Sequence, residues 1–528
     1  MKTLIKNIKI YDGTGEKPYV SDVLVSGDKI EKIAKEIKCE NAEVIDGTGL
    51  CLSSGFIDTH THSDAQLFID PDRKEKLRMG VTAEIGGQCG WSRAPLLPDA
   101  PEAAVSYIHS VYGPKTPDFT TFKEFVDVME KKEIGAHQMC FVGHQYIRGS
   151  VVGMDDRAAT QKELDKMCGL VEEAMQAGAR GFSVGLVYAP GIYSTKNELV
   201  AIAKTVARYG GMFTSHIRNE SNHVLDAVKE VIDVSMEAGV PLNISHMKAM
   251  FPQNWHYYED ILDLIDKSIA EGADITFDVY PYEASSATIL STLPPSYNSH
   301  GTDWLVEHLT GEENINILEK AMMEPTEEFE NPFKNIGPDK MLLSYGKNTP
   351  DAIGKTIKEY ADFKGIRPIE AYAEIIRENR GLAGDIRFNM SEEKIAMFYR
   401  HPKCLVGTDG LYNSGIRISH PRHFGTFPRY LGRFVRDMGV LSFEEGVSRL
   451  TGQAADRYGL KNKGYVKEGY DADLVIFDEK TIIDGATYMD QTIPNKGIKY
   501  VFVSGGIAVK DNEYTGLMNG KFIKYKGL

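Results

Sequence analysis

Eight short apolar runs alternate with stretches of helical periodicity through the middle of the chain, and this alternation constrains the fold more than any other feature. The runs lie at residues 55–62, 81–87, 137–144, 181–186, 212–217, 242–247, 275–282 and 404–410. Strands that alternate with helices form parallel sheets, so these runs predict an α/β protein with a (β/α)8 TIM barrel. The alternative is a doubly wound open sheet. However, no GxGxxG motif follows the first run, and no P-loop motif occurs in the chain.

Both ends of the chain differ from this middle part. Residues 1–54 and 464–528 contain short alternating runs split by turn signals, for example SDVLVSGDKIEKI and KYVFVSGGIAVK. We expect the two ends to form one small β-sandwich domain and residues 55–463 to form the barrel. Residues 283–403 separate the seventh and eighth runs, which is far more than an ordinary crossover needs. This separation predicts an inserted lid at about 288–400.

Charge and cysteine content restrict the partners and the compartment. The chain has 60 basic and 75 acidic residues and a formal net charge of -15, which argues against a nucleic-acid partner. An anionic substrate would therefore need local basic residues. The six cysteines are scattered without a CxxC pair, which is typical of a reducing compartment. The chain lacks a signal-like apolar segment at its start and any membrane-length apolar run, so we expect a cytoplasmic protein with no membrane partner.

Metal-binding side chains gather where the predicted strands end, which is the edge at which barrel active sites form. The first run ends in His60-Thr-His62, and alternating residues of a strand point the same way, so both imidazoles can face one metal. Cys89 follows the second run in GGQCGW, where glycines allow the backbone to approach a metal closely. Alone, an HxH pair occurs often by chance, and an isolated cysteine is usually a buried structural residue.

Three further residues turn this pattern into a predicted zinc site. His216 ends the fifth run, His246 the sixth and Asp409 the eighth. Imidazole, thiolate and carboxylate groups are zinc ligands, and zinc lowers the pKa of water to about 7, which supplies a nucleophile for hydrolysis. A neighbouring carboxylate can take the proton from that water and return it to the leaving group, and Asp409 is our candidate for this role.

The same segments resemble a known family. GFIDTHTHSD is similar to the first-strand metal motif of the amidohydrolase superfamily, and GVTAEIGGQCG resembles the segment that carries a metal-binding cysteine in the D-aminoacylases, or N-acyl-D-amino-acid deacylases. Further similar segments follow in the family's order: VGHQYIR, GARGFSVGLVYAPG, SHIRNES, SHMK, YPYEASS, TDG with HPRHFGTFPR, DADLVIFD and VFVSGGIAVKDNEYTG. The resemblance runs from about residue 3 to the end of the chain.

The resemblance implies a barrel with a β-sandwich, an inserted lid and zinc as cofactor. It implies that a tight zinc is held by Cys89, His216 and His246. His60, His62 and Asp409 would complete the site and leave room for a second, weaker metal. Many superfamily members bridge two metals with a carboxylated lysine on the fourth strand. The fourth run here, GFSVGL, has no lysine, which disfavours a dihydroorotase or hydantoinase and gives Cys89 the bridging position.

Family substrates carry a free α-carboxylate, which needs basic and hydroxyl partners when it is buried. The resemblance nominates four residues for this role: Lys248, Tyr282, Ser286 and Arg422. The loop from Asp409 to Arg422 is longer than the family pattern and adds Arg417. His144 and Arg148, at the end of the third run, are candidates for supporting contacts or for a purely structural role. His420 and His423 are open in the same way.

These observations predict hydrolysis of the amide bond of an N-acyl-D-amino acid to a carboxylate and a free D-amino acid. The alternatives on the same scaffold are a cyclic-amide hydrolase, similar to dihydroorotase or hydantoinase, and a dipeptidase. A non-enzymatic assembly protein similar to dihydropyrimidinase is a third reading, although such proteins have usually lost their metal ligands. The sequence leaves open the preferred side chain (neutral, D-Glu or D-Asp), the number of metals and the oligomeric state.

Overall fold

A computed structural model describes residues 2–112, 117–298, 301–324, 329–411 and 419–527. Each of the eight predicted runs contains a strand of one parallel barrel. These strands are β6 (Phe56–Asp58), β7 (Val81–Gly86), β8 (His137–Cys140) with β9 (Val142–Gly143), β10 (Gly181–Gly185), β11 (Met212–His216), β12 (Leu242–Ile244), β13 (Ile275–Val279) and β17 (Cys404–Val406). A parallel bridge between Thr61 and Gly410 links the first strand to the last. The predicted barrel is confirmed, with its third strand split in two.

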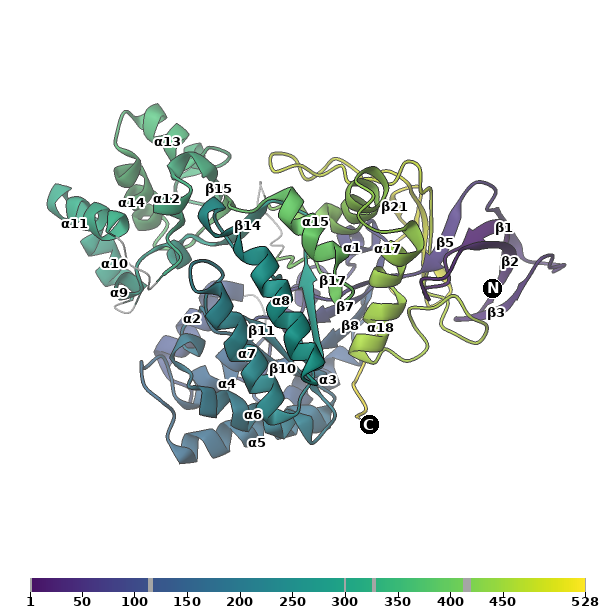
Figure 1. Cartoon of the computed structure of the whole chain (residues 1–528), viewed down its shortest axis with the longest axis horizontal. Coiled ribbons are helices and arrows are strands. Elements are labelled where there is room, and N and C mark those ends of the chain that lie inside the picture. Colours follow the sequence, from purple (N-terminus) through teal and green to yellow (C-terminus); the bar gives the residue numbers. More distant parts are fainter. Residues whose placement is uncertain (1, 113–116, 299–300, 325–328, 412–418, 528) are drawn as a thin grey trace.

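Helices cover the outside of the barrel (Figure 1). They are α1 (Lys74–Leu77), α2 (Glu102–Tyr112), α3 (Phe122–Met129), α4 (His144–Val151), α5 (Gln161–Ala177), α6 (Lys196–Ala207), α7 (Val224–Ala238), α8 (Tyr257–Ala270), α15 (Glu392–Arg400), α16 (Arg422–Arg429), α17 (Phe443–Leu450) and α18 (Gly452–Tyr458). Helix α5 begins where Thr160 and Glu163 form a reciprocal capping box and ends at Gly178, which has a φ of 109°. Among the described residues, we find no helix with the length and apolar character to span a membrane.

Both ends of the chain build one nine-stranded sheet beside the barrel. Its strands are β1 (Lys2–Ile10), β2 (Tyr19–Ser26), β3 (Lys29–Ala34), β4 (Glu43–Asp46), β5 (Cys51–Ser54), β18 (Leu474–Phe477), β19 (Ile498–Val503), β20 (Gly506–Lys510) and β21 (Glu513–Tyr514). The two ends meet where β5 pairs antiparallel with β18. Buried apolar residues of several strands, such as Ile8 and Ile10 of β1 and Leu474 of β18, form a core shared by both ends.

The chain segment between β13 and β17 forms a separate body at one side of the barrel (Figure 1). It contains a three-stranded sheet of β14 (Ala284–Thr288), β16 (Ala383–Phe388) and β15 (Met341–Gly346). Its helices are α9 (Pro295–Asn298), α10 (Thr302–His308), α11 (Glu312–Met323), α12 (Pro332–Asn335), α13 (Ile357–Lys364) and α14 (Pro368–Glu378). We call the segment from β14 to β16 the insert. It has its own hydrophobic core, which Met250 and Phe251 from the barrel loop after β12 enter.

Candidate metal centre

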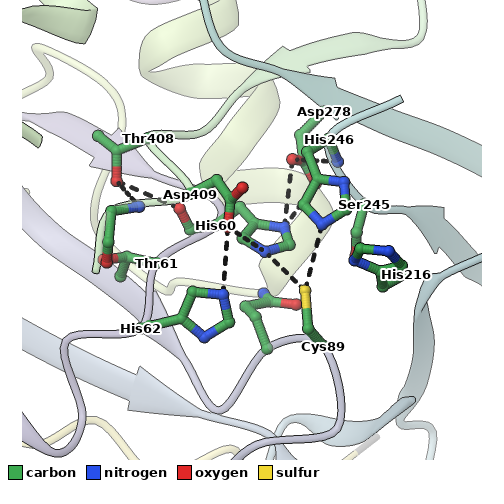
Figure 2. A network of polar contacts seen from close by, with 12 residues as sticks. His60, Thr61, His62, Cys89, His216, Ser245, His246, Asp278, Thr408 and Asp409 are labelled. Atoms are coloured by element: carbon green, nitrogen blue, oxygen red, sulfur yellow. Dashed lines mark hydrogen bonds and ion pairs between the residues drawn. The ribbon is translucent and has the colours of Figure 1, made fainter. Parts of the chain in front are cut away.

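The six predicted ligands converge at the carboxyl ends of the barrel strands (Figure 2). Their ligand atoms form two sets, within each of which all atoms lie within 4.8 Å of one another. His60, His62, Cys89 and Asp409 form the first set, and Cys89, His216 and His246 form the second. Cys89 belongs to both sets. The side chains of His62 and Asp409 are 12% exposed and the other four less, so the group is nearly sealed from solvent.

The contacts within the group suit a metal. The Cys89 Sγ lies 3.3 Å from Nε2 of both His60 and His246, and the His62 Nε2 lies 3.1 Å from the Asp409 Oδ1. His216 is buried, yet neither of its ring nitrogens has a hydrogen-bond partner. A buried polar group without a partner is costly, and a metal ion at this point would satisfy it. The nitrogen, sulfur and oxygen donors fit zinc.

Three of these ligands have left-handed backbone conformations, which non-glycine residues rarely adopt. The φ angle is 54° at Cys89, 34° at His246 and 46° at Asp409. Such conformations cost about 1–3 kcal/mol each and concentrate at functional sites, where the surrounding structure holds them. Next to Cys89, a Cβ added to Gly90 would lie 2.9 Å from the backbone nitrogen of Gly185. A glycine is therefore required where the backbone after Cys89 passes close to Gly185 of β10.

The charges in the site favour the forms of Cys89 and Asp409 that bind metal and accept protons. Burial alone would raise the pKa of the Cys89 thiol, but the neighbouring His60 and His246 lower this pKa well below its usual value. Burial also opposes ionisation of Asp409, but the Arg422 guanidinium, followed by His246, brings the pKa of this carboxyl well below its ordinary range. The site therefore presents a thiolate and a carboxylate at neutral pH.

Two carboxylates that the sequence analysis did not single out lie directly behind the histidines. On β13, Asp278 lies 3.2 Å from the Nδ1 of His60 and accepts a 2.9 Å hydrogen bond from the backbone N–H of His246. Glu220, in the loop after β11, lies 2.9 Å from the Nδ1 of the His246 ring. Asp278 lies within the seventh predicted run, and Glu220 follows the fifth. Their position near the carboxyl end of a predicted strand was the sequence signal that could have identified both. Carboxylates in such positions orient metal-bound imidazoles.

The predicted substrate residues Lys248, Arg422 and Ser286 lie beside the group. The Lys248 Nζ is 2.6 Å from Glu220 Oε1. The Arg422 Nη1 forms a 2.9 Å ion pair with Asp409 Oδ2, and the Arg422 Nη2 donates a 3.4 Å hydrogen bond to the backbone carbonyl of Ser286 on β14. Both cations therefore face the predicted ligands. Arg417 lies outside the described residues.

Tyr280 rather than Tyr282 lies between the two cations. Lys248 Nζ is 5.8 Å and the Arg422 guanidinium 4.7 Å from the centroid of the Tyr280 ring, and the buried Tyr280 hydroxyl has no hydrogen-bond partner. The Tyr282 hydroxyl instead donates a 3.0 Å hydrogen bond to Asp484. Tyr280 was not predicted from the sequence, and its place directly after the end of β13 was the available signal.

His144 and Arg148 of α4 share one buried carboxylate partner, which is not a predicted ligand. Both contact one carboxylate oxygen of Glu198, at 2.9 Å and 3.2 Å. Arg148 also donates to the Pro190 carbonyl at 3.1 Å, which holds the loop that carries Tyr188. The Tyr188 ring packs against His216 with their ring centroids 4.9 Å apart. The His420 Nε2–H donates a 2.8 Å hydrogen bond to the carbonyl of Ala284, where the insert begins.

Comparison with known proteins agrees with this geometry. The amidohydrolase family matches residues 43–509. The D-aminoacylase of Alcaligenes xylosoxydans xylosoxydans is 29% identical over 97% of this chain and 96% of its own length. The N-acyl-D-glutamate deacylase of the same organism is 31% identical, over 94% of this chain and 91% of its own length. The chain belongs to the amidohydrolase family.

Within this family, the resemblance to the D-aminoacylases is confirmed by a solved structure. The N-acyl-D-glutamate deacylase from Bordetella bronchiseptica superposes with a TM-score of 0.84 and 29% identity, covering 99% of each chain. That crystal contains zinc and a phosphonate inhibitor that mimics the tetrahedral intermediate of the reaction. The predicted family and fold class are thus both confirmed, and the same comparison connects this amidohydrolase scaffold to zinc chemistry in a relative.

Proposed function

We propose that the protein is a zinc-dependent hydrolase that cleaves the amide bond of N-acyl-D-amino acids to a carboxylate and a free D-amino acid. The observation that carries the proposal is the convergence of two ligand sets on Cys89, one of which contains an ionised Asp409. The names of the relatives, D-aminoacylase and N-acyl-D-glutamate deacylase, support a linear amide substrate rather than a cyclic one. They disfavour the cyclic-amide hydrolase and the dipeptidase.

Zinc would be held tightly by Cys89, His216 and His246, with His60, His62 and Asp409 completing the centre or holding a second metal. Bound zinc supplies a Lewis acid for the acyl carbonyl and lowers the pKa of water to about 7. The protein itself contributes the fixed positions of the donors, which lie on different strands and are held by outer carboxylates such as Asp278.

Asp409 is the proposed acid and base. Its carboxylate accepts the proton from the attacking water and then donates that proton to the nitrogen of the leaving amine, so that the C–N bond breaks to give a neutral amine. Arg422 orients one carboxylate oxygen at 2.9 Å, and His62 lies 3.1 Å from the other. These two contacts leave the carboxylate no freedom to rotate out of the site.

The substrate's α-carboxylate would lie among Lys248, Arg422 and the Tyr280 hydroxyl, because these groups gather at one side of the ligands. Ser286 stays as a prediction from the family resemblance, and Tyr282, which that resemblance also nominates, is the alternative to Tyr280. We also propose that the insert, predicted as a lid over about 288–400, excludes water from this side. The boundaries at residues 54 and 464 remain our proposed limits between the terminal β-domain and the barrel.

Hydrolysis of paired N-acetyl-D- and N-acetyl-L-amino acids tests the proposal. Zinc-loaded protein is assayed with the Met, Leu, Glu and Asp derivatives, and its zinc content is measured on the same sample. We expect turnover of D-isomers only, and the best side chain identifies the subgroup. Stoichiometric zinc without turnover of either isomer would contradict the proposal and favour cyclic amides or dipeptides.

A further inference from the structure

Glu220 occupies an unusual place behind the metal centre. It lies in the loop after β11, four residues beyond His216, and only 4% of it is exposed. Its Oε1 lies 2.6 Å from the Nζ of Lys248 and 2.9 Å from the Nδ1 of His246. Its Oε2 also lies 3.8 Å from the Nε2 of His216, so the carboxylate reaches two predicted zinc ligands and a predicted substrate residue.

The two nitrogens of the His246 ring face different partners. Nε2 lies 3.3 Å from the Cys89 Sγ, inside the ligand set, and Nδ1 faces Glu220 and Lys248. A ring that binds zinc through Nε2 carries its proton on Nδ1. That N–H needs an acceptor, and between its two neighbours only the carboxylate of Glu220 can accept.

Lys248 would favour the opposite tautomer if Glu220 were absent. Its Nζ also lies 2.9 Å from the Nδ1 of His246, and an ammonium group can only donate. A donor at this distance stabilises a bare Nδ1, which places the proton on Nε2 and blocks the metal. Glu220 removes the competition because it accepts hydrogen bonds from Lys248 and from the Nδ1–H of His246.

The backbone of Glu220 is fixed on both sides, which gives the carboxylate a defined position. The Glu220 N–H donates a 2.7 Å hydrogen bond to the Oε1 of Glu330, a residue of the insert. The Glu220 carbonyl accepts a 2.7 Å hydrogen bond from the N–H of Met250. Met250 in turn enters the core of the insert. The insert thus holds Glu220, and Glu220 holds His246.

We propose that Glu220 is a positioning residue that fixes the Nδ1–H tautomer of His246 and thereby sets the affinity of the Cys89–His216–His246 position for zinc. The inference rests on the proposed function only for the identity of the metal. It extends that function by giving the insert a connection to the metal centre that does not depend on covering the substrate.

The test measures zinc affinity, which requires no substrate. Zinc is removed from the full-length wild type and from Glu220→Gln, and the dissociation constants are measured by competition with a chelator. We expect the variant to bind zinc about 10–100-fold more weakly, the range found when an outer partner of a metal ligand is lost. Glu198→Gln is the matched control, because Glu198 is a buried carboxylate that contacts His144 and Arg148 instead of a predicted ligand. Its zinc affinity should equal that of the wild type.

A double variant separates tautomer control from general damage. In Glu220→Gln/Lys248→Met the competing donor is also gone, so part of the lost zinc affinity should return. Glu220→Asp, which keeps the charge, should fall between wild type and Glu220→Gln and serves if the glutamine variant does not fold. Unchanged zinc affinity in both Glu220 variants, or an equal loss in Glu198→Gln, would overturn the proposal. A wild type that binds zinc but cleaves no N-acyl-D-amino acid contradicts the proposed function alone.

Discussion

Single residues in this centre separate metal binding from proton transfer. Cys89 is the only residue shared by the two ligand sets among the described residues, so Cys89→Ala should release the tight zinc and abolish turnover. Asp409→Asn should keep most of the zinc and lose about 10²-fold or more in rate, the scale for an acid–base group. Zinc analysis and kcat on the same samples check both. Full zinc and full activity in Cys89→Ala would remove this residue from the centre, and near-normal turnover of Asp409→Asn would place the base elsewhere.

Tyr280 and Tyr282 provide a matched pair for the substrate side. The Tyr280 hydroxyl is buried near Lys248 and Arg422 without a partner, so Tyr280→Phe should raise KM for the N-acyl substrate by about tenfold, the effect of roughly one lost hydrogen bond to a charged group. Tyr282→Phe loses only the contact with Asp484 and should leave KM nearly unchanged. A larger effect of Tyr282→Phe on KM would restore the prediction made from the family resemblance.

The six ligands could be predicted from the sequence because the active-site residues of a barrel lie at the carboxyl ends of its strands. The alternation of apolar runs with helical patterns shows where those ends are. The sequence did not predict Asp278 and Glu220, since their roles depend on which ring nitrogen they face, and this depends on packing between strands. Tyr280 was not predicted for a related reason. Strand β13 ends at Val279, so the direction of the side chains that follow depends on the path of the loop rather than on strand alternation.

At the scale of the elements, the insert shows how closely the sequence pattern can locate the boundary between an inserted segment and the barrel. Its length in the sequence predicted a lid, but helical periodicity cannot separate a helix of the insert from one of the barrel. Helix α15 falls in the predicted range and nevertheless contacts β13, β17 and α8, so it packs as a barrel helix. The insert proper ends with β16, whose hydrogen-bonded neighbours are β14 and β15.

Phe251 is the element-scale contact between barrel and insert that we expect to matter most. It comes from the loop after β12, has a φ of 74°, and is fully buried in the core of the insert. Phe251→Ala should cost about 3–5 kcal/mol, the range for a buried phenylalanine, measured by urea unfolding. Phe363→Ala, at a 63% exposed position of the insert, should change stability by less than about 0.5 kcal/mol. Equal losses in the two variants would show that Phe251 does not anchor the insert.

At the scale of the whole molecule, one buried carboxylate, that of Asp473, joins the parts of the chain. Asp473, just before β18, lies 3.1 Å from the Nε2 of His137 on barrel strand β8 and also pairs with Lys463. The other ring nitrogen of His137 accepts a 3.1 Å hydrogen bond from the backbone N–H of Lys521 in the C-terminal tail. The terminal sheet, the barrel and the tail therefore meet at this histidine, a connection between segments far apart in sequence that no local pattern predicts.

This pair should make stability depend on acid. Burial opposes ionisation of Asp473, but His137 and Lys463 lower the pKa of this carboxyl far below its usual value. A carboxyl with a lowered folded-state pKa stabilises the protein above its unfolded pKa of about 4, and this contribution is lost as the pH falls below that value. Asp473→Asn should cost about 1–3 kcal/mol at pH 7, since a neutral amide replaces the charged acceptor of His137 and Lys463 while Lys463 keeps Asp471 at 3.0 Å, and the difference from wild type should shrink below about pH 4. The control is Asp266→Asn, because Asp266 pairs with His401 but has a 66% exposed side chain, so at most about 1 kcal/mol is expected. Urea unfolding of the three proteins between pH 3 and pH 8 decides the matter: a constant difference across this range would mean that the carboxylate charge of Asp473 does not hold the parts together.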